Sequence, residues 1–398
     1  MKWVSAFSFL PINYAVELAR SEDRTQRLTF DSNLNGEKVR VRFSNRYAKK
    51  ELRLRSVTVG IVRGDRMEDI RPVTLRGRRE IALAPGEEAW SDETELSVRA
   101  LDRLAVTGYT GEPQSVESVC AFWSAQGPLV ELSGSGDYTG GGPFEPVPSA
   151  EIYPVIAEDA NPVKAFFFYG VSGLQVWTDD DVKTVVMFGD SITHMGMIAN
   201  ALSARLAEAY PGKVSVINRG IGGNRLLYDA TKVDFLPAEG SCFGPAGVSR
   251  FEEDVFGQES VDAVLVLEGI NDIMHPIQFG HEEEAVTAEE LVNGFRTLID
   301  IARRHGAKIF GATVTPCGSD DYPAEWMRRF EQVRTELNSR LREGIGFDGV
   351  FDYDAAIRDG ARPDRIRAGC HIGDGLHPND KGGRLMAETI DLSALMGR

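Results

Sequence analysis

The feature that most constrains the fold is a short run from Thr184 to Thr193, TVVMFGDSIT. Its four consecutive apolar residues, 185–188, predict a strand that is buried on both faces of a parallel sheet. Gly189 then permits a sharp turn, and a helical pattern of apolar residues begins near Met195. Ser191 is therefore expected at the carboxyl end of the strand, where open α/β sheets bind their ligands. The helix N-terminus would favour negative charge there, although a serine in this position can also simply cap the helix.

The same alternation of strands and helices continues to the end of the chain. Predicted strands cover 185–188, 214–218, 263–267, 309–314 and 350–353, and predicted helices cover 196–209, 287–305, 323–343 and 379–389. Thr287 and Glu290 form a capping-box pattern at the start of the second of these helices. This alternation predicts an α/β fold in which helices cover both faces of a parallel sheet.

The first part of the chain has a different pattern, in which short strands of alternating polarity are separated by turns. Predicted strands lie at 38–43, at 52–61 with a slip at 55–56, and at 81–83, 96–101, 166–169 and 174–177. Such a series predicts a β-sandwich. The acidic stretch Asp179–Asp181 marks the expected boundary. We therefore expect two domains, residues 1–178 and 179–398.

Composition narrows the possible partners and the cellular location. The formal net charge is −16, from 60 acidic and 44 basic residues, which argues against nucleic acid or an anionic membrane surface as the main partner. The short apolar stretch Trp3–Leu10 stops at Pro11 and has no clear signal-peptide cleavage site. The four scattered cysteines lack the spacing of zinc ligands. We therefore expect a cytoplasmic protein with reduced thiols and no bound metal.

Three further segments follow predicted strands of the α/β half. The glycines at 220, 222 and 223 do not match the dinucleotide-binding pattern, which disfavours a nucleotide cofactor. The amide of Asn271 could donate to a developing oxyanion, or Asn271 and Asp272 could simply form a turn. Asp374 and His377 could point into one cleft, with the carboxylate fixing the tautomer of the imidazole, although a histidine before a proline is commonly structural.

All these segments follow predicted parallel strands, so they can lie together at one edge of the sheet. Ser191 would supply a nucleophile, and His377 a base that Asp374 orients. Gly223 and Asn271 would supply oxyanion donors. Together these groups are the parts required for acyl transfer.

The motifs resemble the four signature blocks of the SGNH (GDSL-type) hydrolase family. The blocks are Gly189-Asp190-Ser191, Gly223, Gly269-x-Asn271-Asp272 and Asp374-x-x-His377. Residues 39–45, 243–245, 250–251, 254, 267–273 and 373–380 further resemble the two-domain branch of that family. The resemblance covers nearly the whole chain. It implies an SGNH-type, flavodoxin-like, three-layer α/β/α hydrolase domain preceded by an all-β, jelly-roll-like sandwich domain.

The resemblance also implies a role for each residue of the site. Ser191 would be the nucleophile and His377 the general base, with Asp374 orienting the imidazole. The oxyanion hole would comprise the backbone N–H groups of Ser191 and Gly223 and the side-chain amide of Asn271. No metal or organic cofactor is implied. Many members have Asp where this chain has His194, which we expect to be an exposed loop residue, with substrate contact as the alternative.

The branch includes proteins associated with xylan and other acylated polysaccharides. The expected function is therefore a serine esterase that removes short acyl groups, in particular acetyl from acetylated carbohydrate, through an acyl-enzyme. The alternatives are a general short-chain arylesterase or thioesterase, and a non-catalytic carbohydrate-binding protein. The expected partner is a small-molecule or oligosaccharide ester substrate, and the oligomeric state cannot be read from the sequence.

The substrate pocket is harder to read from the sequence. Residues 228–254 have no strong periodicity and are expected to form one wall of the pocket. Nothing in them resembles an apolar lid, which disfavours long-chain lipids. Trp90, Trp123 or Tyr138 could stack on sugars, but we expect the sandwich to be structural.

Overall fold

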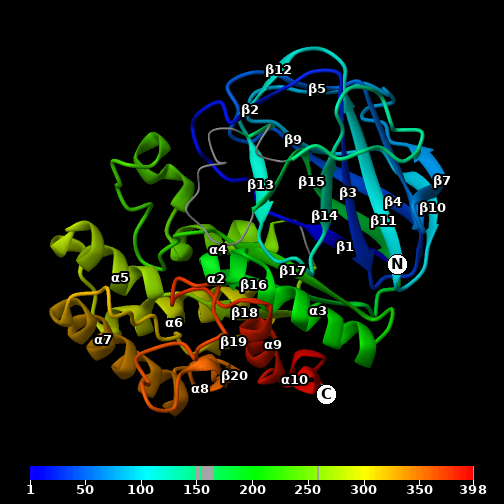
Figure 1. Ribbon diagram of the computed structural model, residues 1–398. Helices are drawn as coiled ribbons and strands as arrows, with labels where there is room; N and C mark the ends of the chain where they lie inside the picture. Colours follow the sequence, from blue (N-terminus) through cyan, green and yellow to red (C-terminus); the bar gives the residue numbers. More distant parts are fainter. Residues whose placement is uncertain (149–151, 154–164, 258–259, 398) are drawn as a thin grey trace. The chain divides into compact units, whose positions relative to one another are not determined.

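The structure is a computed structural model that describes residues 1–148, 152–153, 165–257 and 260–397. The chain divides into two compact units (Figure 1). The first comprises Met1–Val182 with Leu206–Ile217, and the second comprises Lys183–Arg205 with Asn218–Arg398. The boundary between residues 178 and 179 stays a prediction.

Antiparallel strands form the first unit. They are β1 (Lys2–Ser8), β2 (Ala19–Ser21), β3 (Arg24–Ser32), β4 (Gly36–Ser44), β5 (Leu52–Leu54), β6 (Ser56–Arg63), β7 (Arg66–Pro72), β8 (Ile81–Leu83), β9 (Glu88–Trp90), β10 (Thr94–Val98), β11 (Asp102–Thr110), β12 (Gln114–Val116), β13 (Val119–Phe122), β14 (Leu129–Leu132) and β15 (Phe166–Thr178). One sheet has the order β1-β15-β4-β10, with β13 beside β15 and β9 beside β4. A second sheet has the order β14-β3-β11-β6-β7, and short ladders join β12 to β2 and β5 to β8.

An aromatic core lies between the two large sheets. Phe7 of β1 stacks on Phe30 of β3, with ring centroids 4.8 Å apart. The Phe7 ring also lies 5.8 Å from that of Phe168 in β15. Because these residues come from both sheets and are at most 5% exposed, the two sheets share one core. This arrangement confirms the predicted β-sandwich.

Three strand predictions in this unit differ from the structure. The strand predicted at 96–101 is β10, which ends at Val98. The stretch 52–61 is two strands, β5 and β6, which are separated at Arg55, where the pattern slips. Both stretches predicted as strands at 166–169 and 174–177 are extended, but they are parts of one strand, β15, rather than two strands. Its register against β4 shifts between Val171 and Gly173. The small residues between the two segments therefore form an irregularity within one strand rather than a turn.

A parallel sheet organises the second half of the chain. Its strands are β16 (Lys183–Gly189), β17 (Val214–Gly220), β18 (Ala263–Leu267), β19 (Lys308–Ala312) and β20 (Gly349–Phe351). Their spatial order is β17-β16-β18-β19-β20, which is the flavodoxin-like order 2-1-3-4-5. The predicted α/β class is therefore confirmed, and each predicted strand of this half is present within three residues of its expected ends.

Helices cover both faces of this sheet. They are α2 (Ser191–His194), α3 (Met197–Ala209), α4 (Gly247–Phe256), α5 (Ile270–Phe279), α6 (Ala288–Arg304), α7 (Ala324–Glu343), α8 (Tyr353–Ile357), α9 (Asp380–Glu388) and α10 (Leu392–Leu395), with 3₁₀ turns η1 (Pro237–Phe243) and η2 (Glu282–Glu284). In Figure 1, α3 and α9 lie in front of the sheet and α4 behind it. The four predicted helices are confirmed, and the capping box of Thr287 and Glu290 begins α6.

The structure also contains helices that the sequence pattern did not predict. Part of the stretch 228–254, which lacks strong periodicity, forms η1 and the start of α4. The segment after β18 forms α5, which contains Pro276. Within the described residues, none of the helices is both long enough and apolar enough to cross a membrane.

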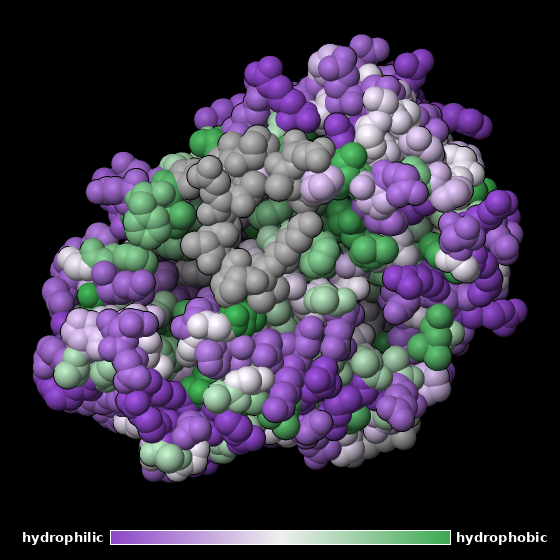
Figure 2. Space-filling view, in the orientation of Figure 1, coloured by the Kyte–Doolittle hydropathy of each residue, from purple (hydrophilic) through white to green (hydrophobic). Residues whose placement is uncertain are grey.

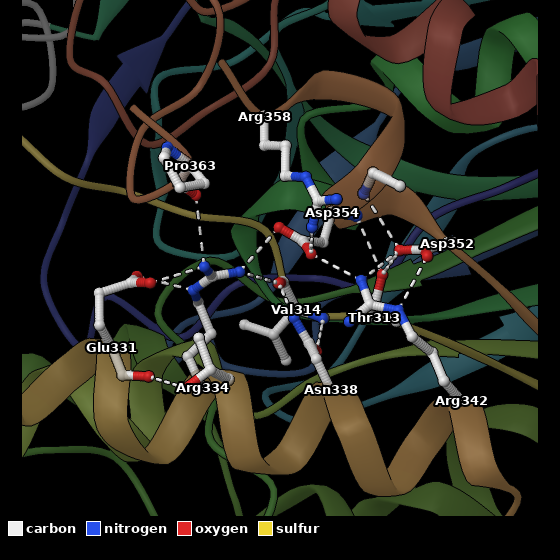
Figure 3. A network of polar contacts seen from close by, with 12 residues as sticks. Thr313, Val314, Glu331, Arg334, Asn338, Arg342, Asp352, Asp354, Arg358 and Pro363 are labelled. Atoms are coloured by element: carbon white, nitrogen blue, oxygen red, sulfur yellow. Dashed lines mark hydrogen bonds and ion pairs between the residues drawn. The ribbon is translucent and has the colours of Figure 1, made fainter. Parts of the chain in front are cut away.

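A buried polar network joins α7 to the segment after β19 and to α8 (Figure 3). The guanidinium of Arg334 donates to the carboxylate of Asp354 at 2.8 Å and to the carbonyl of Val314 at 3.2 Å. The amide of Asn338 pairs with both the N–H and the C=O of Val314, each at 2.8 Å. The outer face of α7 is rich in Arg and Glu, and Figure 2 shows a mainly hydrophilic surface over α7 and α8.

Candidate active site

The turn between β16 and α2 presents Ser191. Asp190 is the N-cap of α2, and its Oδ1 accepts a hydrogen bond from the Ile192 N–H at 2.9 Å. The alternative that Ser191 caps the helix is therefore wrong, because Asp190 has that role. A Cβ at Gly189 would lie 2.2 Å from Thr193 Oγ1 and 2.4 Å from the Leu267 carbonyl. Only glycine fits at this position. The tight turn that it permits presents the side chain of Ser191, two positions later.

Ser191 is joined to His377 and Asp374 by a chain of hydrogen bonds. His377 Nδ1 lies 2.5 Å from Asp374 Oδ2, and His377 Nε2 lies 2.8 Å from Ser191 Oγ. The carboxylate can only accept, so the ring donates from Nδ1 and its Nε2 is left to accept from the serine hydroxyl. Ser191 and His377 are 186 positions apart in the chain.

The loop that carries the histidine is held by its own polar groups. Asp374 Oδ1 accepts from the backbone N–H of Leu376 at 2.9 Å and of His377 at 3.0 Å. His371 Nδ1 accepts from the N–H groups of Gly373 at 3.1 Å and Gly375 at 3.0 Å. The loop is therefore fixed on both sides of Asp374.

The charge state of Asp374 follows from these contacts. Partial burial acts to raise its pKa, but the hydrogen bond and the charge of His377, with the two backbone N–H groups, outweigh burial and leave the pKa below its usual value. Asp374 is therefore ionised at neutral pH, as a carboxylate that orients an imidazole must be.

The Gly223–Asn224 turn and the start of α5 lie against each other. Asn271 Nδ2 donates to the Asn224 carbonyl at 2.8 Å. Asp272 accepts from the backbone N–H groups of Leu226 at 2.6 Å and Leu227 at 2.9 Å. Both side chains therefore fix the segment that contains Gly223 rather than a local turn of their own.

Gly223 itself requires glycine. Its φ is +74°, and a Cβ there would lie 2.0 Å from the ring of Phe243. The half-buried Phe243 ring lies in turn 5.3 Å from the ring of His275 in α5. An aromatic side chain from the stretch 228–254 therefore stands next to the Gly223 backbone.

Three buried carboxyl groups lie near the proposed nucleophile. Burial raises the pKa of Asp190. Burial, together with the neighbouring Asp190 charge, raises the pKa of Glu268 well above its usual value. Burial raises the pKa of Asp272 to about 6, against the lowering effect of the Leu226 and Leu227 N–H groups. Burial therefore favours the neutral form of these three carboxyl groups.

One expectation about this region is wrong. His194 is not an exposed loop residue; it is 3% exposed and ends α2. Its Nδ1 accepts a hydrogen bond from the Gly222 N–H at 3.0 Å. The side chain therefore braces the glycine-rich turn, a role that a short motif in the sequence does not reveal.

The structure thus joins Ser191, His377 and Asp374 directly, and joins Asn271 to the Gly223 turn through Asn224. Sequence reasoning missed the bracing roles of His371 and Asn224. The signal for these roles in the sequence was the presence of a histidine and an asparagine within or beside the glycine-rich motifs. Within the part of the chain that the structure describes, no group of three or more His, Cys, Asp or Glu side chains could hold a metal ion.

Comparison with known proteins agrees with the sequence motifs. The model of the GDSL-like Lipase/Acylhydrolase family matches residues 187–385. This range is half of the chain and contains all five predicted site residues. A search of curated proteins finds no match.

Two solved structures illustrate the structural similarities. An α/β hydrolase from the metagenome of Lake Arreo, Spain, is 21% identical, over 54% of this chain and 95% of that one, with a TM-score of 0.38. A variant of an acetyl xylan esterase from Geobacillus stearothermophilus is 20% identical, over 54% of this chain and 94% of that one, with a TM-score of 0.40. Both TM-scores are below 0.5, so the family assignment rests on the sequence match. The chain belongs to the GDSL-like lipase/acylhydrolase family and is a carboxylic ester hydrolase.

Proposed function

We propose that the protein is a serine esterase that removes short acyl groups, in particular acetyl from acetylated carbohydrate, with Ser191 as nucleophile. The observation that carries the proposal is the chain of hydrogen bonds from Ser191 Oγ through His377 to Asp374. This geometry matches the general requirement that a nucleophile contact its base and that the base be oriented by a third group.

In the proposed reaction, Ser191 Oγ attacks the ester carbonyl while His377 Nε2 takes the hydroxyl proton. Asp374 stabilises the imidazolium that forms. The tetrahedral oxyanion accepts hydrogen bonds from the N–H groups of Ser191 and Gly223 and from the amide of Asn271. His377 then protonates the departing alcohol, which leaves an acyl-enzyme, and a water molecule repeats the sequence to release the acid.

One contact and the burial of the residue support the role of Asn271. One N–H of its amide is used by the Asn224 carbonyl at 2.8 Å, which fixes the plane of the amide and leaves the second N–H for the oxyanion. The side chain is 2% exposed, and a hydrogen bond to developing charge is stronger where water is excluded. Asn271→Ala is expected to lower kcat by about 10²–10³-fold.

The preference for a short acyl group is supported by Phe243. Its ring stands against Gly223, so a bulky side chain borders the proposed oxyanion hole. Substitution of Phe243 by Ala should therefore extend the accepted acyl chain. A carbohydrate alcohol is proposed from the resemblance to the two-domain branch.

Hydrolysis of p-nitrophenyl acetate, butyrate and octanoate by the wild type, Ser191→Ala and Phe243→Ala tests these statements. We expect acetate to be preferred, Ser191→Ala to be inactive, and Phe243→Ala to shift the preference toward butyrate. Acetylated xylo-oligosaccharides and an acyl-thioester, compared by kcat/KM, then separate the proposed activity from an arylesterase or a thioesterase. Activity that survives in Ser191→Ala would overturn the mechanism.

A further inference from the structure

Arg250 of α4 lies outside the motifs of the proposed site, yet it donates hydrogen bonds to Gly189, Asn224 and Glu268, which lie close in the chain to proposed site residues. Its side chain is only 4% exposed. All five N–H groups of the guanidinium have an acceptor. Nε donates to Asn224 Oδ1 at 2.8 Å, Nη1 to the Arg219 carbonyl and to Asp254 Oδ2 at 3.0 Å each, and Nη2 to the Gly189 carbonyl at 2.9 Å and to Glu268 Oε1 at 3.2 Å.

Three of the acceptors lie in the segments that carry the proposed nucleophile and the other oxyanion donors, and the remaining two are the Arg219 carbonyl of β17 and Asp254 of α4 itself. Gly189 ends β16 and lies two positions before Ser191. Asn224 directly follows Gly223. Glu268 directly follows β18 and lies three positions before Asn271. A single guanidinium is therefore bonded to the segment of the nucleophile and to the segments of both other oxyanion donors.

The contacts also restrain the orientation of the guanidinium itself. Its carbon lies 3.9 Å from the centroid of the Phe188 ring, so the guanidinium is held over an aromatic side chain of β16. A planar group with five donors in fixed directions can hold several acceptors in one geometry. A lysine at this position would supply the same charge with three donors and no fixed plane.

Arg250 is separate from the other half of the proposed site. None of its hydrogen bonds within the described chain goes to the loop that carries Asp374 and His377. Its effect on the reaction should therefore concern the position of the nucleophile and the oxyanion donors. The ionisation of the base should be unaffected.

We propose that Arg250 is a positioning residue for the reaction, which holds the segments of Ser191, Gly223 and Asn271 in the arrangement that stabilises the oxyanion. The inference rests on the proposed function of those three residues. It goes beyond that function by assigning the alignment of the oxyanion hole to one side chain that does not touch substrate.

The test compares Arg250→Lys with Arg334→Lys. Arg334 is a matched control, because it is also buried and bonded on every side, to Glu331, Asp354 and the carbonyls of Val314 and Pro363 (Figure 3). Both variants remove a planar fork and keep a charge. Circular dichroism and active-site titration report the folded fraction, to which all rates are normalised.

For Arg250→Lys we expect kcat for p-nitrophenyl acetate to fall about 10²-fold, the cost of a small misplacement of catalytic groups. KM and the midpoint of the acid limb of kcat/KM should stay near their wild-type values. The rate of Ser191 phosphonylation by a fluorophosphonate should fall together with kcat. Arg334→Lys should keep the wild-type kcat per folded molecule, whatever its stability.

A second variant, Arg250→Ala, provides a chemical test. Millimolar guanidinium chloride should raise its kcat, whereas sodium chloride and urea at the same concentration should not. If neither Arg250 variant folds, Phe188→Leu, which removes the stacked ring and keeps every hydrogen bond, should lower kcat several-fold without a change in KM. A wild-type kcat in Arg250→Lys or in Phe188→Leu, or an equal loss in Arg334→Lys, overturns the inference. A wild-type protein that neither hydrolyses esters nor reacts with the fluorophosphonate contradicts the proposed function instead.

Discussion

At the scale of single residues, the site depends on side chains that hold backbone segments as much as on those proposed to react. Asp374 and His371 fix the same loop from two sides. Asn271 and Asp272 fix the turn after Gly223. The proposed catalytic groups are placed by these contacts, because a loop without them would spread over many conformations.

Gly223→Ala should abolish most of the activity. A Cβ there meets Phe243 at 2.0 Å with φ at +74°, so the turn must move and displace the proposed oxyanion donor. We expect kcat to fall by about 10²-fold or more.

Gly280→Ala is the matched control for this substitution. Gly280 has the same φ, +74°, but a Cβ there meets nothing within 4 Å. We expect this variant to lose about 1–2 kcal/mol of stability and to keep its kcat. Equal losses of kcat in the two variants would show that backbone strain alone, rather than displacement of the donor, explains the effect.

His371 offers a second test at this scale. His371→Ala removes the acceptor of the Gly373 and Gly375 N–H groups, and we expect kcat to fall about 10-fold as the loop loosens. In His371→Asn, the side-chain oxygen can replace Nδ1 as acceptor, so most of the activity should return. An alanine variant as active as the wild type would show that the loop does not need this support.

At the scale of elements, short connections after parallel strands place the site and longer helices secure the sheet. The turn into α2 presents Ser191, and the start of α5 supplies Asn271. Helix α7 contributes no proposed catalytic group, but Arg334 and Asn338 attach it to the segment after β19. Substitutions in α7 should therefore change the free energy of unfolding rather than kcat.

Two arginines that share Asp354 test this view of α7. Arg334 is buried with the carboxylate, whereas the side chain of Arg358 is 43% exposed. Arg334→Ala should lower the free energy of unfolding by about 3 kcal/mol, because it breaks a buried pair. Arg358→Ala should cost less than about 1 kcal/mol. Urea denaturation measures both values, and equal costs would contradict the distinction.

Helix α5 should also give the protein a specific sensitivity to acid. Burial, with a smaller effect of the Arg225 charge, lowers the pKa of His275 from 6.5 to about 3. The folded protein therefore keeps this histidine neutral while the unfolded chain protonates it below pH 6.5. The stability from this group is complete above pH 6.5 and is lost as the pH falls toward 3.

His275→Asn removes the titration and keeps a polar partner for Thr231, whose hydroxyl lies 2.7 Å from His275 Nδ1. When the pH falls from 7 to 5, the unfolding free energy of the wild type should decrease by about 2 kcal/mol more than that of the variant. Urea denaturation at the two pH values measures this. A difference that does not change with pH would mean that His275 titrates normally in the folded state.

At the scale of the whole molecule, much of the fold and of the candidate site could be predicted from local pattern. Buried parallel strands and long amphipathic helices have strong periodicity, so β16, β18, α6 and α7 were predicted close to their observed ends. Ser191 and His377 were predicted at one sheet edge because their segments follow predicted parallel strands.

The parts that could not be predicted depend on tertiary contacts. The strand β15 continues through small residues because partner strands pair along its length. The burial of His194 depends on the Gly222 turn, 28 positions away. The role of Arg250 depends on acceptors from three separate segments, at Gly189, Asn224 and Glu268. No local periodicity in the sequence reports such contacts.

The measurement that tests the central claim most directly is identification of the residue that a fluorophosphonate labels. The wild type should be modified once, at Ser191, as shown by intact mass and by peptide mass spectrometry. His377→Ala should be labelled far more slowly, because Nε2, 2.8 Å from Ser191 Oγ, is the proposed acceptor of its proton. Labelling at another serine, or equal labelling rates in the two proteins, would contradict the account.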